Sequence, residues 1–374
     1  SSSIHINYED IIHDVAIGDK ITVDNGLINL EVLSKEERTM QCRVLDGGVL
    51  KSKRHVNLPG IRVNLPAITE KDKRDIAFAI DQEVDFIALS FVRDPEDILS
   101  LKRLLGRKAE KIKIIAKIED QEGVKNLDQI IAESDGIMVA RGDLGVEIPF
   151  ERLPRVQRRI IRQCAYHGKR VIVATHMLES MIENPMPTRA EVTDVANAVY
   201  EEVDAIMLSG ETTIGKYPFK CVEVLDKIAR SIEHSPGLQF TEHLILNNDK
   251  QEIAAAAVKL AESIHARAII VPTRRGLMAN LVTNCHPQKP VICAFTNDSR
   301  TRRQLVLNRN LLSYRINFSS DSEKTLSNAA AILLSREDFN RADKVVVISD
   351  ALSGSSVDAI QIRQLGDLVK ADAK

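Results

Sequence analysis

Two charged residues of opposite sign stand at the end of an apolar run, at a spacing that suggests a binding or catalytic site. In "IIAKIEDQEGV", residues 114–124, Lys117 and Glu119 are two positions apart. Residues i and i+2 of a strand lie on one face, so both side chains project into one site if the strand extends that far. A carboxylate there suits Mg²⁺, which proteins usually hold through one or two carboxylates together with substrate oxygens.

A second carboxylate, Asp143, follows the next apolar run in "VARGDLGVEIP". Its neighbours Gly142 and Gly145 let the backbone approach a ligand closely. Two carboxylates from neighbouring strand ends, with the Lys117 ammonium beside them, predict a clamp for phosphoryl or enolate oxygens. The alternative at this point is a structural ion pair between Lys117 and Glu119 at the rim of a sheet.

Parallel strands are the elements that must position these residues. Between 66 and 235, nearly continuous apolar runs alternate with amphipathic segments, a pattern typical of a parallel sheet covered by helices. Polar residues follow each run, as they do at the catalytic face of a (β/α)₈ barrel. Only five βα units are present, so an open sheet stays an alternative. The expected strands are 85–91, 112–118, 136–140, 170–175 and 204–209.

The two flanking zones differ from this central one. Residues 1–60 predict β-hairpins that turn at Asn25-Gly26 and at Gly47-Gly48. Residues 236–374 predict a smaller doubly wound α/β domain, whose expected strands are 268–272, 291–295, 311–316, 344–349 and 359–363. We therefore expect three domains, at residues 1–60, 61–235 and 236–374.

Bulk composition narrows the class of protein. The 374 residues are 44% hydrophobic and 28% charged, with a net charge of −2, which shows no bias toward nucleic acid or membrane. No apolar run is long enough to span a bilayer, and the first residues lack a signal-peptide pattern. Five scattered cysteines without metal-like spacing favour reduced thiols and a cytoplasmic location.

Several segments in order resemble the pyruvate kinase family. They are "KSKRHVNLPG", "IKIIAKIEDQEGV", "IMVARGDLGVEIP" and the long "VIVATHMLESMIENPMPTRAEVTDVANAVYEEVDAIMLSGETTIGKYP". The resemblance implies an α/β fold: a (β/α)₈ TIM barrel, with about five βα units in this chain, a small β-rich lid and a C-terminal α/β domain. It also implies a homotetrameric phosphotransferase of the last step of glycolysis, which moves a phosphoryl group from phosphoenolpyruvate to ADP and gives pyruvate and ATP. The implied ions are Mg²⁺, which Mn²⁺ can replace, and K⁺.

The resemblance also implies roles for individual residues. Glu119 and Asp143 would hold Mg²⁺, and Lys117 would neutralise charge on the transferring phosphoryl group. Thr175 would lie near enolpyruvate, and the proton donor stays open, with water one candidate. Further implied contacts are Ser90 and the Gly142 backbone in the substrate pocket, and Lys53 and Arg54 at the nucleotide. His176 stands where the family more often has Gln, Asn or Lys, and we expect it in the pocket wall rather than as a catalyst. Without the resemblance, "KSKR" reads equally as a solvated run of charges.

The chain also departs from the family pattern at its start and in its C domain. It begins inside the lid, so three barrel units, half of the lid and the K⁺ ligands have no counterpart, and we expect part of a longer enzyme or an N-terminally truncated form. In the C domain the loop "PTRRGLMAN" replaces most of a hydroxyl-rich phosphate cradle. A fructose-1,6-bisphosphate-type site is not favoured, whereas another phosphorylated effector stays open. The candidate effector residues are Thr273, Arg275, Gly276, Ser353, Ser355 and Ser356.

Two other functions stay open on the sequence alone. One is a metal-dependent lyase or aldolase on a TIM barrel, acting on pyruvate or phosphoenolpyruvate, and a nucleotide requirement would separate it from a kinase. The other is a truncated, non-catalytic paralogue that acts through its C domain.

Overall fold

The computed structural model describes residues 3–8, 10–24, 26–50, 52, 54–61, 67–349 and 359–369. Contacts between residues group the chain into two compact units. The first consists of Ser1–Ile161, Ile172–Ala198 and Ile206–Arg230. The second consists of Arg162–Val171, Val199–Ala205 and Ser231–Lys374. The three domains expected from the sequence do not coincide with these two units, and their boundaries stay a prediction.

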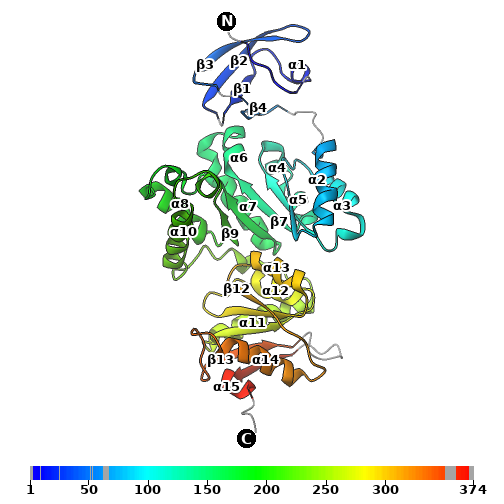
Figure 1. The fold of residues 1–374 in the computed structure, drawn as a ribbon, viewed down its shortest axis with the longest axis vertical. Helices are drawn as coiled ribbons and strands as arrows, with labels where there is room; N and C mark the ends of the chain where they lie inside the picture. Colours follow the sequence, from blue (N-terminus) through cyan, green and yellow to red (C-terminus); the bar gives the residue numbers. More distant parts are fainter. Residues whose placement is uncertain are drawn as a thin grey trace. The chain divides into compact units, whose positions relative to one another are not determined.

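The N-terminal part of the first unit is a four-stranded antiparallel sheet in the order β3-β2-β1-β4, coloured blue in Figure 1. Alternating apolar residues give it a core of its own, which includes Ile21, Val23 and Val32. The elements are α1 (Ile11–Asp14), β1 (Lys20–Val23), β2 (Ile28–Lys35), β3 (Met40–Asp46) and β4 (Val56–Asn57). We call this sheet with α1 the lid.

One of the two predicted hairpins is present in the lid. Strands β1 and β2 pair with Val23 opposite Ile28, around the predicted Asn25-Gly26 turn, although Asn25 itself lies outside the described residues. The hairpin predicted at Gly47-Gly48 is wrong. Strand β3 pairs back onto β2, through a turn closed by a hydrogen bond from Glu36 N to Thr39 O, and β4 pairs with β1 instead.

A five-stranded sheet in the order β5-β6-β7-β8-β9 forms the centre of the first unit (Figure 1). The register is parallel, with Phe86 opposite Lys113 and Ile115 opposite Gly136. Buried Ile, Val and Ala side chains fill the inner strands β6, β7 and β8, whereas the edge strands β5 and β9 are mostly half-buried. The five predicted strands are therefore confirmed. Their bounds are β5 (Phe86–Leu89), β6 (Lys113–Ile118), β7 (Gly136–Ala140), β8 (Arg170–Ala174) and β9 (Ala205–Met207).

Helices connect these strands, and short polar residues start several of them. Thr69 and Asp72 form a capping box at α2, and Asp94 and Asp97 form one at α3. Such caps satisfy the first free N–H groups of a helix. The helices are α2 (Glu70–Asp81), α3 (Pro95–Leu105), α4 (Gln121–Lys125), α5 (Leu127–Glu133), α6 (Arg141–Glu147), α7 (Leu153–Tyr166), α8 (Arg189–Tyr200), α9 (Gly210–Thr213) and α10 (Pro218–Ile232).

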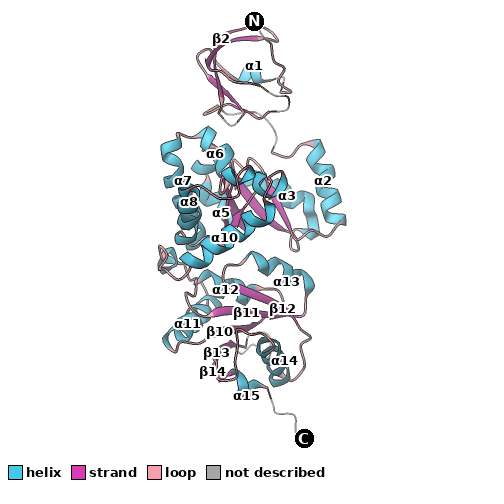
Figure 2. Cartoon of the chain, turned by 60° about the vertical axis from the view of Figure 1, so that its left-hand side comes forward, coloured by secondary structure: helices cyan, strands magenta, loops and turns pink. Residues whose placement is uncertain are grey.

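The second unit is built on a five-stranded sheet in the order β12-β11-β10-β13-β14 (Figure 2). Helices α11 and α12 supply one of its two cores, and α14 and α15 supply the other, so the predicted doubly wound arrangement is present. Strand β14 pairs antiparallel with β13, which the sequence pattern did not indicate. The strands are β10 (Ala268–Pro272), β11 (Val291–Thr296), β12 (Leu311–Arg315), β13 (Lys344–Ile348) and β14 (Ile360–Gln364). The helices are α11 (Asp249–Ser263), α12 (Leu277–Asn284), α13 (Ser299–Gln304), α14 (Ser322–Leu334) and α15 (Leu365–Leu368).

Within the described part of the chain, no helix is both long enough and apolar enough to cross a lipid bilayer.

Candidate active site

Lys117 and Glu119 meet at the end of β6. The Lys117 Nζ lies 2.7 Å from Glu119 Oε1 and donates a hydrogen bond of 3.0 Å to Ser90 Oγ, just after β5. The other Glu119 oxygen, Oε2, accepts a 2.6 Å hydrogen bond from the Phe91 N–H. Glu119 is almost completely buried, at 1% exposure, whereas the Lys117 side chain keeps 24% of its surface exposed. The structure therefore brings together three of the predicted site residues.

The two predicted metal-binding carboxylates, Glu119 and Asp143, lie close enough for electrostatic repulsion between them. Burial raises the pKa of the Glu119 carboxyl, and the negative charge of Asp143 raises it further, against the opposing hydrogen bonds from Lys117 and Phe91. Two carboxylates that repel each other in a buried setting suit a divalent cation placed between them. Among the residues that the structure describes, no group of three or more potential ligands surrounds one point. A metal here would therefore complete its coordination with water or substrate oxygens.

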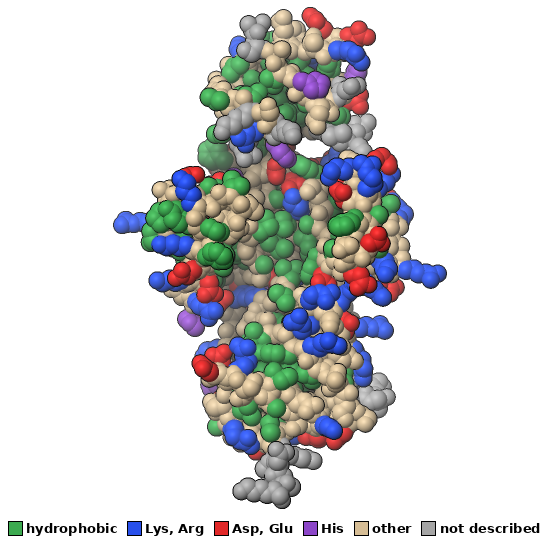
Figure 3. All heavy atoms as spheres, viewed as in Figure 1, with side chains coloured by type: hydrophobic (Ala, Val, Ile, Leu, Met, Phe, Trp, Pro, Cys, Tyr) green, Lys and Arg blue, Asp and Glu red, His purple; other side chains and the backbone are tan. Residues whose placement is uncertain are grey.

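Figure 3 shows a hollow lined with hydrophobic side chains between helices α2 and α3 on one side and α8 and α10 on the other. Charged side chains gather at its upper end. A hollow with apolar walls and a few charged groups at one end is the usual form of a small-molecule site.

Thr175 follows β8 and lies against the start of α6. The Gly142 N–H donates a 2.7 Å hydrogen bond to Thr175 Oγ1, which in turn donates to Ala174 O at 2.6 Å. A Cβ on Gly142 would lie 3.5 Å from that hydroxyl oxygen, an ordinary van der Waals contact, so the close approach is made by the Gly142 N–H itself. His176 comes next, and both residues have positive φ angles, 69° for Thr175 and 54° for His176.

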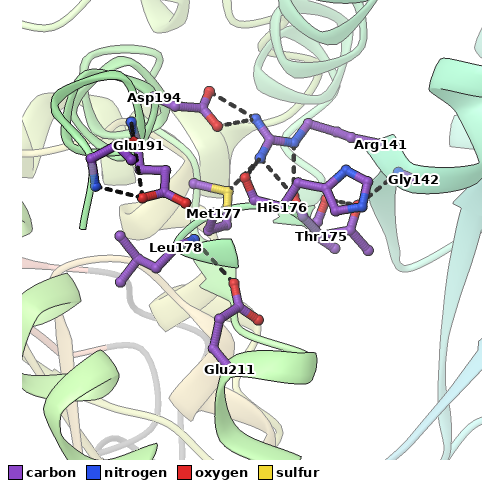
Figure 4. Close-up of polar contacts among 11 residues, drawn as sticks. Arg141, Gly142, Thr175, His176, Met177, Leu178, Glu191, Asp194 and Glu211 are labelled. Atoms are coloured by element: carbon purple, nitrogen blue, oxygen red, sulfur yellow. Dashed lines mark hydrogen bonds and ion pairs between the residues drawn. The ribbon is translucent and has the colours of Figure 1, made fainter. Parts of the chain in front are cut away.

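Three residues that the sequence reasoning left without a role support this turn (Figure 4). The Arg141 guanidinium donates to Thr175 O at 2.6 Å and pairs with Asp194 of α8 at 2.7 Å. Glu211, with 0% exposure, accepts hydrogen bonds from Leu178 N at 3.0 Å and Ser209 N at 2.8 Å. The polar run after each strand was the available signal for Arg141 and Glu211. Asp194 lies inside helix α8, where no sequence signal marked it.

The lid contacts this site through two residues near β4. Asn57 Nδ2 donates a 3.3 Å hydrogen bond to Glu147 Oε1 at the end of α6. His55 Nδ1 lies 3.7 Å from Asp143 Oδ1. Of the two predicted nucleotide residues, Arg54 pairs with Asp24 at 3.3 Å, and Lys53 lies outside the described residues.

The described candidate effector residues, Thr273, Arg275 and Gly276, belong to the second unit. Gly276, with φ 80°, donates its N–H to Thr273 Oγ1 at 3.1 Å, so this loop folds back on itself ahead of α12. Thr273 is buried and Arg275 is exposed. Ser353, Ser355 and Ser356 lie outside the described residues.

Comparison with known families gives two matches along the chain. Residues 1–222 match the family described as pyruvate kinase, barrel domain, and residues 251–362 match pyruvate kinase, alpha/beta domain. Together these two matches span most of the sequence.

Individual relatives give the same result. The chain is 41% identical to a pyruvate kinase of Bacillus licheniformis, over 98% of this chain and 64% of that protein. It is 42% identical to the chloroplastic pyruvate kinase isozyme G of Ricinus communis, over 97% of this chain and 88% of that protein. Identity to a pyruvate kinase of Geobacillus stearothermophilus is 46%, over 80% and 52% of the two chains. The chain thus spans a little under two thirds of the length of the Bacillus licheniformis relative.

Proposed function

We propose, since the chain belongs to the pyruvate kinase family, that it transfers the phosphoryl group of phosphoenolpyruvate to ADP and releases pyruvate and ATP. The observation that carries this proposal is the cluster of Lys117, Glu119 and Ser90, with Asp143 near enough to raise the pKa of Glu119. An ammonium and two carboxylates in a partly buried site can bind a metal and a phosphoryl group together.

In this proposal the Lys117 ammonium is the main group of the chain that stabilises the transferring phosphoryl group. The bond between the enol oxygen of phosphoenolpyruvate and phosphorus breaks, and a β-phosphate oxygen of ADP bonds to that phosphorus. Lys117 neutralises charge on the phosphoryl oxygens during transfer, while Ser90 orients the ammonium through its hydrogen bond. The enol oxygen keeps the bonding electrons, and C3 then takes up one proton to give pyruvate.

Membership of the family implies that a metal ion takes part, and we propose Mg²⁺ held by Glu119 and Asp143. When bound, Mg²⁺ supplies positive charge to the substrate carboxylate and phosphoryl oxygens. Lys117 Nζ lies 2.7 Å from Glu119 Oε1 in this structure, so that oxygen would be available to the metal when the ammonium turns to the phosphoryl group. The K⁺ that the family resemblance implies, with Mn²⁺ as a substitute for Mg²⁺, is part of the same proposal.

The lid would hold the nucleotide and exclude water. Arg54 is the described one of the two proposed nucleotide residues, and it would exchange its partner Asp24 for ADP phosphates. Closing a lid over the site suppresses hydrolysis of the phosphoryl group. The homotetramer and the phosphorylated effector stay predictions. The cytoplasmic location does so too, since the relatives include both bacterial and chloroplastic proteins.

Omission of ADP tests the proposal against the lyase alternative. Pyruvate release from phosphoenolpyruvate is measured with Mg²⁺, with and without ADP, and again after chelation of the metal. We expect release to require both components. Release at an undiminished rate without ADP would reject the kinase and favour a lyase or hydrolase.

A further inference from the structure

Two consecutive residues with side chains adopt the left-handed backbone conformation beside the site. Thr175 has φ 69° and His176 has φ 54°. This conformation is unfavourable for any residue with a Cβ, and most of all for a β-branched residue such as threonine. Strain of this kind persists only where surrounding groups hold it, and it concentrates at functional sites.

The group that holds both residues is the Arg141 guanidinium (Figure 4). Nη2 donates to Thr175 O at 2.6 Å and to His176 O at 3.2 Å, and Nε donates to Thr175 O at 3.2 Å. One planar cation therefore fixes two successive carbonyls of the strained turn. Arg141 is only 7% exposed, so these bonds compete little with water.

Asp194 holds the guanidinium in turn. The Arg141 Nη1 lies 2.8 Å from Asp194 Oδ1 and 2.7 Å from Oδ2. Asp194 belongs to α8, whereas Arg141 begins α6, so the pair joins two helices at the turn after β8. A buried guanidinium without its carboxylate would be unfavourable, which makes Asp194 necessary for the position of Arg141.

The Thr175 hydroxyl is the atom that this arrangement orients. Its hydrogen goes to Ala174 O, and one lone pair accepts the Gly142 N–H. Within the described residues, one lone pair is then left over for a further donor. A hydroxyl used in this way accepts a hydrogen bond, for example from a water molecule that carries the proton for enolpyruvate.

We propose that Arg141 and Asp194 are positioning residues for the proton-transfer half of the reaction, because they hold the Thr175 hydroxyl in place through the strained turn. This inference rests on the proposed function, since it takes enolpyruvate as the species that accepts the proton. The proton adds at C3 with the electrons of the C2=C3 double bond, and electrons of the enolate oxygen form the C2=O bond of pyruvate. Lys117 and Glu119 bond to Ser90 and Phe91 rather than to this pair, so phosphoryl transfer depends on it less.

Asp194→Asn is the test variant, because Asp194 lies outside the helix that carries Asp143. Arg141→Lys is the second, since lysine keeps the charge but cannot donate to two carbonyls and a carboxylate together. Glu191→Gln is the matched control on α8. Glu191 accepts hydrogen bonds from Ser180 and Thr188 and none from the turn, among the described contacts.

Two rates are compared for each variant. The proton step is followed alone, as exchange of pyruvate methyl protons with D₂O by proton NMR, and phosphoryl transfer is followed from phosphoenolpyruvate and ADP. We expect Asp194→Asn to slow methyl exchange about tenfold or more, because the Thr175 hydroxyl would be misplaced. KM for phosphoenolpyruvate should stay within about threefold of the parent value. We expect Glu191→Gln to change neither rate by more than about twofold.

A third variant tests the strain itself. Glycine adopts φ 54° without strain, so His176→Gly added to Asp194→Asn should restore about a third or more of the lost exchange rate. Amide hydrogen exchange of residues 172–178 is measured as well, which does not depend on activity. We expect Asp194→Asn to speed it and Glu191→Gln to leave it unchanged.

Parent-like methyl exchange in Asp194→Asn, or parent-like amide exchange in residues 172–178, overturns the inference. A parent protein that makes no pyruvate from phosphoenolpyruvate and ADP overturns the proposed function instead. In that case the amide exchange still decides whether Asp194 holds the turn.

Discussion

Asn57 Nδ2 donates a 3.3 Å hydrogen bond to Glu147 Oε1, which joins the strand leading out of the lid to the last residue of α6. Gln121 Nε2 donates to the Glu147 carbonyl at 2.5 Å, and the backbone of Gly60 also hydrogen-bonds to the Glu147 carboxyl. Helix α6 also carries Asp143. The contacts that Asn57 and Gly60 make with Glu147 are therefore linked to the proposed metal site through this one helix.

The Glu147 carboxyl predicts a pH-dependent stability. Burial raises its pKa from 4.5 to about 7, and the charges of Asp120 and Asp143 add to that shift. The folded state therefore binds this proton more tightly than the unfolded state. The stabilisation is complete below about pH 4.5 and is lost as the pH rises through 7. Between pH 5 and 8 we expect the free energy of unfolding of Glu147→Gln to fall by about 2 kcal/mol less than that of the parent, with an allowance for residual solvent access.

Urea unfolding of the metal-free protein across this pH range measures the Glu147 effect. The parent should lose stability relative to Glu147→Gln as the pH rises. Parallel pH profiles for the two proteins would show that Glu147 is ionised in the folded state at ordinary pH.

Lys117→Met should separate phosphoryl transfer from folding. The variant removes the only charge that contacts both Ser90 and Glu119 in the described site. We expect kcat to fall about a thousandfold, the scale for loss of a charge that stabilises the transferring phosphoryl group. Unfolding free energy should fall by about 1–3 kcal/mol, since Glu119 loses a buried partner. Mn²⁺ binding, followed by electron paramagnetic resonance, should persist, and turnover like that of the parent would remove Lys117 from the mechanism.

Arg54→Gln should weaken nucleotide binding specifically. In the proposal, Arg54 leaves Asp24 to meet ADP phosphates, while phosphoenolpyruvate binds near Lys117. We expect KM for ADP to rise about tenfold, which corresponds to one charged hydrogen bond, with KM for phosphoenolpyruvate unchanged. Arg43→Gln, which breaks another ion pair in the lid, is the control. Equal increases in both KM values would point to lid unfolding rather than to a nucleotide contact.

Glu211→Gln should destabilise the first unit. The fully buried Glu211 carboxylate accepts the Leu178 and Ser209 N–H groups, and an amide nitrogen in place of one oxygen would face an N–H donor. We expect the free energy of unfolding to fall by about 1–3 kcal/mol. Glu223→Gln, at an exposed position of α10, should change it by less than about 0.5 kcal/mol in the same denaturant titration. Equal stability of the two variants would contradict the role of Glu211.

Local pattern was enough to predict the strands that carry the site. The apolar runs that became β6 and β7 are continuous and bounded by polar residues, so their ends could be read to within a residue. The i, i+2 spacing also placed Lys117 and Glu119 on one face. By contrast, Gly47-Gly48 resembled a hairpin turn, but strand pairing is settled by which neighbours bury their apolar faces.

Tertiary pairing set the limit of what the sequence could predict at the site. Asp194 is 53 residues from Arg141 and lies within a regular helix, so no local pattern marks it. Strand β14 was predicted, but its antiparallel orientation was not, because parallel and antiparallel strands share the same alternation of side chains. The left-handed pair at Thr175 and His176 runs against local preference, so only the structure reveals it.

Phosphorus NMR of the protein purified from its native cells, mixed with phosphoenolpyruvate, ADP, Mg²⁺ and K⁺, tests the central claim most directly. We expect the phosphoenolpyruvate signal to disappear while the γ-phosphate signal of ATP grows by an equal amount. Inorganic phosphate in place of ATP, or a phosphoenolpyruvate signal that stays unchanged, would contradict it.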